Sequence, residues 1–341
     1  MSEFKISECE VINVSSEEKE EIIDYGVKMV GAPLEWHETM GEGIRVGIID
    51  TGVDSEHPEL RNRIKDGANF YDRNTDNFDD DNGHGTHISG IVAAEKNGIG
   101  VVGVAPKADL YIAKAFGSDG KTSYPAIEKS IKWLIDRKVD VINMSFSSSA
   151  TSPQYKALIS DVHRRGISII CAAGNEGELG ENTIGYPANF PETVAVSAVD
   201  INKNIAEFNS RGRAAEISAA GIDIYSTYPG GGYATLSGTS MATPIITGAV
   251  AILMGKGLLR YGRRLTPDEI RLLLNIYTEN INNSGRDKSY GYGIFSFGRI
   301  GNKEYILNES AKNVPGVSTK KFSTAKDIAA VLMAYKFLDL F

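Results

Sequence analysis

The stretch IRVGIID, residues 44–50, is a short apolar run that ends in a carboxylate. It lacks the polar/apolar alternation of a strand with one face in water, which is typical of a parallel strand covered on both faces. Four later runs have the same character, at residues 108–116, 139–146, 167–174 and 193–200. Together the five runs predict a buried, mostly parallel sheet.

Helical patterns separate these strands. Residues 124–138 and 152–166 have apolar residues at helical spacing and basic residues in the last turn. Residues 240–255 are typical of a buried helix, and residues 266–277 open with a capping Thr, a Pro and two acids. Because strands and helices alternate, we expect an α/β protein with an open, mostly parallel twisted sheet and helices on both faces.

Composition narrows the class of protein. The chain has 341 residues, of which 42% are hydrophobic and 23% charged, enough to bury a large core. Its net charge of −8 argues against nucleic acid or an anionic membrane as a partner. Two cysteines give no disulfide framework. We find no signal peptide and expect no membrane span, so a cytoplasmic location is expected.

The two ends of the chain differ from the middle. Residues 1–20 are polar and acidic, and residues 300–341 end in an apolar helical pattern. We therefore expect one domain at 21–299 with an extension on each side. The apolar tail 325–341 is compatible with a homodimer, or with a tail that folds back on the domain.

Polar residues that could act together follow the strands. Asp50 and Asn175 each end a buried strand, and Ser240 starts the predicted buried helix. In such sheets functional groups gather at the carboxyl ends of strands, and a serine nucleophile needs a base with an orienting group. Among the five histidines, His84 lies between two glycines and directly before an apolar helix. His87, about one turn further, is expected to pack as a structural residue.

Each of these features is also compatible with a simpler role. Taken alone, Asp50 and Asn175 suit turns and Ser240 suits a helix cap. Residues 98–103, GIGVVG, match a dinucleotide-binding fingerprint but follow a helix where that motif follows a strand. His84 and His87 lack the spacing and the intervening acid of a zinc-protease helix.

Four motifs in order resemble the signature blocks of the subtilisin (S8) serine endopeptidases: DTG at 50–52, GHGTH at 83–87, AAGN at 172–175 and GTSMATP at 238–244. The resemblance covers residues 25 to about 299 and implies a subtilisin-like three-layer fold that hydrolyses protein or peptide substrates. It assigns Asp50 as orienting carboxylate, His84 as general base, Ser240 as nucleophile and Asn175 as oxyanion-hole donor. The alternative is a catalytically silent binding protein on the same fold.

The resemblance further implies that the substrate binds as an added strand. It assigns the substrate site to Gly120, Tyr124, Ser145, Phe146, Ser147, Ala172, Ala173, Gly174 and Gly185. Phe146 and Ser147 depart from the family's usual Leu-Gly, which leaves the shape of the pocket wall open. Glu176, Glu178 and Glu181 near the primary pocket would favour a basic side chain before the scissile bond, or they form a solvated acidic loop.

Two more expectations come from the resemblance. A structural Ca²⁺ is implied at Glu21, Glu59, Glu95, Asn97, Ile99 and Val101, which offer hard oxygen ligands. The short acidic N-terminus resembles that of the intracellular branch, in which the extension lies across the active site. Autoinhibition by residues 1–20 is therefore expected, although EFKIS (3–7) only partly resembles the start of that segment and the branch's Pro-Tyr is absent.

Overall fold

A computed structural model describes residues 3–6, 11–15, 20–72, 76–281 and 286–298. The predicted extension 300–341, with its apolar tail, lies outside the described residues. The helices are α1 (Tyr25–Met29), α2 (Ala32–Glu35), α3 (His84–Ala93), α4 (Tyr124–Asp136), α5 (Pro153–Arg164), the 3₁₀-helix η1 (Gly177–Leu179), α6 (Thr239–Tyr261) and α7 (Pro267–Ile276). The strands are β1 (Glu3–Lys5), β2 (Val11–Ser15), β3 (Arg45–Asp50), β4 (Ile64–Asn69), β5 (Asp109–Lys114), β6 (Lys121–Ser123), β7 (Val141–Met144), β8 (Ser168–Ala172), β9 (Val194–Val199), β10 (Ala215–Ala220), β11 (Ile224–Tyr228), β12 (Gly232–Leu236), β13 (Thr278–Glu279) and β14 (Ile294–Phe295).

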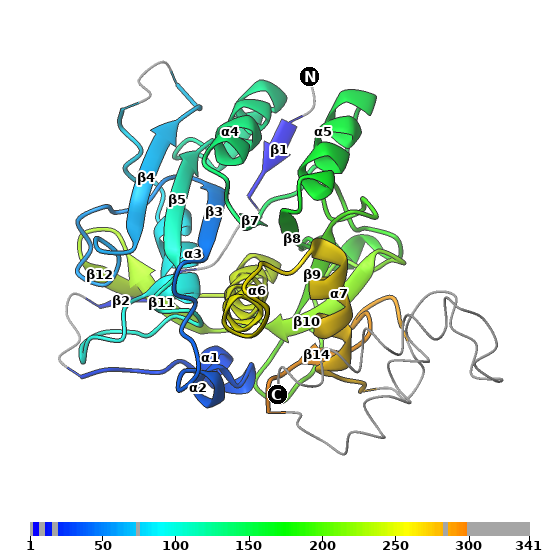
Figure 1. The fold of residues 1–341 in the computed structure, drawn as a ribbon. Coiled ribbons are helices and arrows are strands. Elements are labelled where there is room, and N and C mark those ends of the chain that lie inside the picture. Colours follow the sequence, from blue (N-terminus) through cyan, green and yellow to red (C-terminus); the bar gives the residue numbers. More distant parts are fainter. Residues whose placement is uncertain (1–2, 7–10, 16–19, 73–75, 282–285, 299–341) are drawn as a thin grey trace.

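The predicted α/β sheet is confirmed. Nine strands form one sheet in the order β13-β14-β10-β9-β8-β7-β3-β5-β4, and every neighbouring pair except β13–β14 is parallel. The five strands predicted from apolar runs, β3, β5, β7, β8 and β9, form its continuous centre (Figure 1). Their carboxyl ends therefore share one edge.

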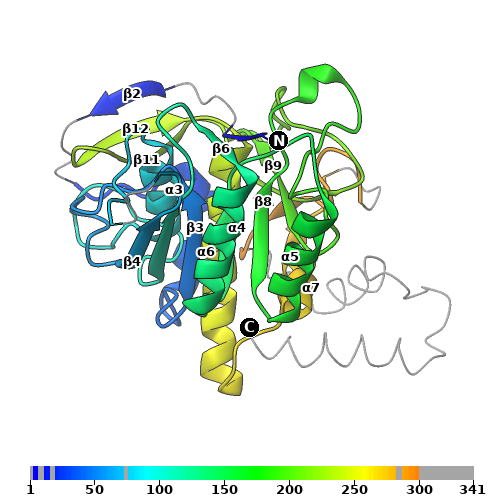
Figure 2. The ribbon, with the colours of Figure 1, turned by 90° about the horizontal axis from the view of Figure 1, so that it is seen from above.

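Helices cover both faces of this sheet (Figures 1 and 2). Side chains of β3 alternate between two cores: Ile48 packs in a cluster with α3, α6 and α7, whereas Ile49 packs in a cluster with α4 and α5. Successive strand residues point to opposite faces, so a strand buried on both sides needs no polar alternation. This is the physical reason that the apolar runs identified the sheet.

Helix α6 is longer than predicted and runs to Tyr261, where Gly262 adopts a left-handed conformation. It lies within the core although it contains Pro244, which cannot donate a hydrogen bond to the carbonyl of Ser240. The hydroxyl of Ser145 donates to that carbonyl instead, at 3.0 Å. The expectation of no apolar stretch long enough for a membrane needs correction: α6 qualifies by length and composition, but 89% of its most apolar window is buried inside the protein, as in the core helix of a globular domain.

Two smaller sheets were not predicted. Strand β1 pairs antiparallel with β6, and strands β11, β12 and β2 form a second antiparallel sheet. Both contain segments of the N-terminal extension, so residues 3–5 and 11–15 lie on the domain as added strands. These pairings join residues far apart in the sequence, and no local pattern encodes them.

Candidate active site

Asp50 and His84 form a buried hydrogen-bonded pair at the carboxyl edge of the sheet. Asp50 ends β3 and is fully buried, and His84 is the first residue of α3. The Nδ1 atom of His84 lies 2.7 Å from Oδ1 of Asp50. Gly85 permits this approach, because a Cβ atom there would lie 2.1 Å from the carbonyl oxygen of Gly52. The carboxylate therefore fixes the orientation of the imidazole ring.

Asp80 holds together the two loops that carry this pair. Its Oδ1 accepts hydrogen bonds from the hydroxyl of Thr51 at 2.8 Å and from the N–H of Gly83 at 2.9 Å. Its Oδ2 accepts from both the N–H and the hydroxyl of Thr86, at 2.8 and 2.7 Å. Burial alone would raise the pKa of Asp80, but the hydrogen bonds from Gly83, from Thr86 and from the N–H of Asn82 lower it. A stable anion thus ties the loop after β3 to the first turn of α3.

Ser240 lies in the first turn of α6 and is buried. Its hydroxyl donates to the carbonyl of Ser145 at 3.1 Å, while the Ser145 hydroxyl donates to the Ser240 carbonyl. This reciprocal pair attaches the start of α6 to the segment after β7, at the edge where Asp50 ends β3. Amide N–H groups at a helix start favour negative charge nearby.

Asn175 is oriented by Thr239. Its Oδ1 accepts from the N–H of Thr239 at 3.1 Å and from the Thr239 hydroxyl at 2.8 Å. Because a backbone N–H can only donate, the oxygen of the amide must face Thr239, which places the NH₂ group on the other branch of the side chain. The two Thr239 contacts thus fix the orientation of the Asn175 amide at the residue before Ser240.

His87 is a packing residue, as predicted. It is fully buried, and its Nε2 lies 3.0 Å from the carbonyl of Ile224 and 3.1 Å from that of Ala234. Burial, with a smaller contribution from His84, lowers the pKa of His87 to about 3. The ring is therefore neutral at physiological pH and links α3 to the β11–β12 hairpin.

The two predicted substrate edges lie on either side of residues 3–6. The N–H of Ile6 donates to the carbonyl of Gly120 at 2.9 Å. Lys5 and Ser147 exchange both backbone hydrogen bonds, each 3.0 Å long. Residues 3–6 therefore form the middle strand between the β6 segment and the segment after β7.

The Phe4 side chain of that strand lies in a pocket of aromatic residues. It is 1% exposed, and its ring centroid lies 5.3 Å from that of Tyr155 and 5.9 Å from that of Phe146, both edge to face. Tyr124 flanks Tyr155 at 5.5 Å. Phe146, which departs from the usual Leu of the resembled family, is thus one wall of this pocket.

The remaining predicted substrate residues follow β8 or lie beside it. Ala172 ends β8, with Ala173 and Gly174 next, and Gly185 packs so closely that a Cβ atom would lie 2.8 Å from the carbonyl oxygen of Ser148. A Cβ atom on Gly174 would lie 2.5 Å from the Oε2 atom of Glu176. Of the three acids predicted near the primary substrate pocket, Glu176 lies against Gly174, whereas Glu181 forms an ion pair with Lys288.

The profile of the Subtilase family (Peptidase S8) matches residues 41–293, more than half of the chain. The chain belongs to the subtilase family. The Intracellular serine protease of Paenibacillus polymyxa is 39% identical to this subtilase over 283 residues, 82% of this chain and 87% of that protein. Subtilisin E of Bacillus subtilis (strain 168) is 42% identical over 236 residues, 69% of this chain and 61% of that protein. The Major intracellular serine protease of the same organism is 37% identical over 252 residues, 72% of this chain and 79% of that protein. This subtilase is thus a serine endopeptidase that acts on protein or peptide substrates.

The residues expected to bind calcium in this subtilase lie together around Glu59. Glu59 is fully buried; its Oε1 lies 3.1 Å from the Tyr233 hydroxyl, whereas Oε2 has no hydrogen-bond partner in the described part of the chain. Burial raises the pKa of Glu59 to about 8. The charges of Glu95 and Glu21 add smaller increases, whereas the hydrogen bond from Tyr233 acts in the opposite direction. An unpaired buried carboxylate oxygen is what a bound cation would satisfy.

The other expected ligands contribute unequally. Glu21 carries an ion pair with Lys96 at 3.1 Å, and Glu95 is held by Arg63 at 2.9 Å, which leaves its backbone carbonyl as the group to offer. The Oδ1 atom of Asn97 accepts from the N–H of Ile99 at 3.1 Å, and Val101 forms a bridge with Ile22. No cluster of three or more His, Cys, Asp or Glu side chains suited to a metal occurs among the residues described. A cation here would therefore need carbonyl and amide oxygens in addition to the carboxylates of Glu59 and Glu21.

Sequence reasoning missed Asp80, Thr51 and Thr239, which act on the site only through other residues. Asp80 lies four residues before His84 in DDDNGHGTH (79–87), where an acidic run resembles a solvated loop. Its role becomes visible only when the chain folds and Thr51 and Thr86 reach it.

Proposed function

We propose that this subtilase cleaves peptide bonds through Asp50, His84 and Ser240. The observation that carries the proposal is the 2.7 Å contact between Asp50 and His84 at the sheet edge where the first turn of α6 contains Ser240. The Ser240 hydroxyl attacks the scissile carbonyl while Nε2 of His84 takes its proton. Asp50 stabilises the resulting imidazolium, which then protonates the leaving amine before water hydrolyses the acyl-enzyme.

Asn175 and the N–H of Ser240 stabilise the oxyanion in this proposal. Thr239 holds the oxygen of the Asn175 side chain, so the NH₂ group is preorganised before the substrate arrives. Replacing Asn175 by Ala is expected to lower kcat by about 10²–10³-fold, a magnitude that comes from a member of this same family. The hydroxyl of Ser240, which now donates to Ser145, rotates toward His84 during the reaction.

Residues 1–20 act as a built-in inhibitor in this proposal. Residues 3–6 already fill the position of an added strand, with backbone hydrogen bonds to Gly120 and Ser147 and with Phe4 buried in the aromatic pocket. A substrate needs the same hydrogen bonds, so the extension competes with it. A variant that begins at residue 21 is expected to be more active than the full chain.

Glu176 favours a basic side chain before the scissile bond. Its carboxylate borders Gly174 and lies 3.6 Å from the ammonium of Lys5. A peptide library is expected to show a gain for Arg or Lys over Leu or Phe, and Glu176→Gln is expected to remove that gain. Equal cleavage of all four would leave Glu176 as part of a solvated loop.

A structural Ca²⁺ would be held by Glu59, the side chains of Glu21 and Asn97 and the carbonyls of Glu95, Ile99 and Val101. Such an ion would stabilise the loop 95–101 against the domain.

The relatives named as intracellular proteases support a cytoplasmic location. A homodimer through residues 325–341 stays a prediction, which light scattering of the full chain and of a variant ending at residue 299 would test.

Casein hydrolysis by the purified protein, with and without calcium, tests the proposal beside Ser240→Ala. Activity in the parent that is lost in Ser240→Ala supports the triad. Casein binding without hydrolysis by the parent, also after removal of residues 1–20, would favour the catalytically silent alternative.

A further inference from the structure

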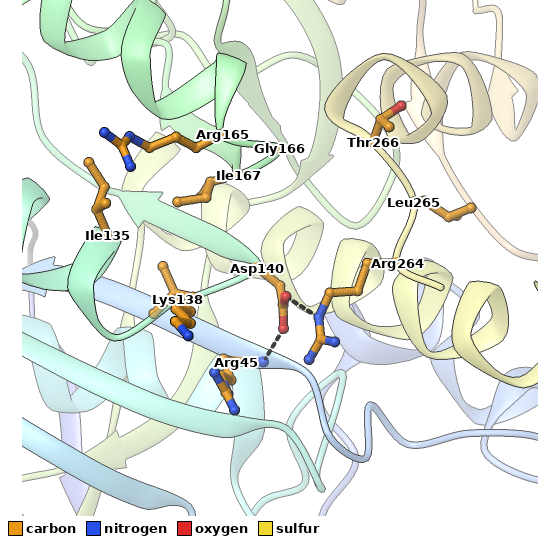
Figure 3. Close-up of a pocket in the computed structure, with 11 residues that line it drawn as sticks. Arg45, Ile135, Lys138, Asp140, Arg165, Gly166, Ile167, Arg264, Leu265 and Thr266 are labelled. Carbon is orange, nitrogen blue, oxygen red and sulfur yellow. Dashed lines mark hydrogen bonds and ion pairs between the residues drawn. The ribbon is translucent and has the colours of Figure 1, made fainter. Parts of the chain in front are cut away.

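A second hollow lies at the opposite edge of the sheet from the active site. It has a volume of about 580 Å³ and is bordered by the segments that enter β3, β7 and β8 and by the turn between α6 and α7. Five charged residues line it: Arg45, Lys138, Asp140, Arg165 and Arg264 (Figure 3). We call it the basal pocket. Its size falls in the range of small-molecule sites.

The single acid of the basal pocket is already neutralised. The carboxylate of Asp140 is 5% exposed and accepts from the guanidinium of Arg264 and, at 2.8 Å, from the N–H of Arg45 (Figure 3). Asp140 and Arg264 thus form a closed pair, which fixes the turn after α6 against β7. Lys138 and the side chain of Arg45 have no ion pair among the described residues, although the charge of Arg45 also acts on Asp140, and Arg165 shares one carboxylate with Arg164.

Few acidic groups of the described residues balance the positive charges of Arg45, Lys138 and Arg165. Among the described residues, the guanidinium of Arg45 donates only to the carbonyl of Arg137, at 3.4 Å. Arg165 contacts Asp161 at 2.7 Å, but Asp161 also pairs with Arg164, so one carboxylate serves two cations. Lys138 is exposed and has no ion pair in the described part of the chain. It also adopts a left-handed backbone, with φ of 55°, that non-glycine residues rarely take.

Helix dipoles account for only part of this positive charge. Lys138 and Arg165 follow α4 and α5, whose carboxyl ends carry about half a negative charge each and so favour cations. Arg45 and Lys138 without an ion pair, and Arg165 sharing one carboxylate with Arg164, leave a surplus of positive charge against two such half charges, in a protein with a net charge of −8. Apolar side chains also line the pocket, among them Val139, Ile167 and Leu265.

We propose that the basal pocket binds a small polyvalent anion, a phosphate or polycarboxylate compound. Guanidinium groups suit paired oxygens of such anions, and an ammonium adds a point charge. The charged group would contact side chains among Arg45, Lys138 and Arg165, with any apolar part against the apolar lining residues. The site is separate from the proteolytic edge, so this proposal stands whether or not the catalytic proposal holds.

Calorimetric titration of the Ser240→Ala protein with pyrophosphate and, separately, with citrate at near-physiological salt tests the proposal. We expect saturable binding of at least one, and the anion that binds identifies phosphate or polycarboxylate chemistry. The double variant Lys138→Gln/Arg165→Gln is expected to bind about tenfold more weakly, because each lost charge-assisted contact contributes to affinity.

The control is Lys129→Gln/Lys156→Gln, which removes the same amount of charge at exposed positions of α4 and α5 outside the pocket. It is expected to change affinity by less than about twofold, since exposed charges at a distance are screened. Lys138→Gln alone, at an exposed position, provides a second readout in a minimally altered fold. Absence of binding of both anions at millimolar concentration, or equal weakening by both double variants, would overturn the proposal.

Discussion

Replacing Phe4 by Ala should release the extension from the substrate cleft. The side chain is 1% exposed and makes edge-to-face contacts with Tyr155 and Phe146. Burial of a Phe side chain contributes about 1.5–3 kcal/mol, and each aromatic pair about 0.5–1.5 kcal/mol. A loss of about 3 kcal/mol corresponds to an inhibition constant about 10²-fold higher.

The assay is inhibition in trans. A synthetic peptide of residues 1–16 is added to the variant that begins at residue 21, and initial rates on a chromogenic peptide give the inhibition constant. Lys5→Ala is the matched control, because its ion pair with Glu176 is long and 59% exposed on the lysine side. Such a pair contributes at most about 1 kcal/mol, or about fivefold. If the Phe4→Ala peptide inhibits as well as the parent, or Lys5→Ala is the weaker inhibitor, the assignment of residues 3–6 to the substrate strand is wrong.

Three further outcomes are expected. Asp80→Asn should lower kcat by about 10²-fold with little change in KM, because an amide cannot accept all the hydrogen bonds that position His84. The control, Asp79→Asn at an exposed position, should have no effect on steady-state rates. Calcium at a hundredfold excess over its Kd should add about 2.7 kcal/mol to the free energy of unfolding of Ser240→Ala. In thermal melts with calcium or EDTA, Glu59→Gln should remove most of that gain, whereas Glu56→Gln, at an exposed position, should not. Because burial, with a smaller effect of His84, lowers the pKa of His87 to about 3, the unfolded chain binds more protons than the folded one from about pH 6.5 down to that value. Stability should therefore fall on acidification, with a contribution from this histidine approaching about 1.4 kcal/mol per pH unit. Denaturant titrations at pH 7 and 5 measure it, exposed His37→Gln should leave the trend unchanged, and a flat profile would contradict the buried neutral ring.

The central sheet was predictable because its strands are buried on both faces. Each apolar run from IRVGIID onward is long enough for one strand and is bounded by helix signals. Strand β4, IKDGAN, was missed because it lies at the edge of the sheet and is polar, and β10, AEISAA, because it is rich in small residues. Hydrophobic pattern reports burial, so strands with little apolar surface give little signal.

The site was predictable only in part. Asp50 and His84 could be paired because each adjoins a structural boundary, the end of β3 and the start of α3. By contrast, the role of Ser145 follows from Pro244, whose missing N–H leaves the Ser240 carbonyl to be satisfied from another segment. That partnership spans the sheet edge and has no sequence period. The basal pocket likewise combines residues from distant segments and becomes apparent only in three dimensions.

Labelling with a phosphonyl fluoride tests the central claim most directly. The variant that begins at residue 21 is treated with the reagent, and the modified peptide is located by mass spectrometry. We expect one adduct per chain, on Ser240, with labelling greatly slowed in His84→Ala and absent in Ser240→Ala. Casein hydrolysis that persists without an adduct on Ser240, or labelling of Ser240 that does not depend on His84, would contradict the proposed nucleophile and base.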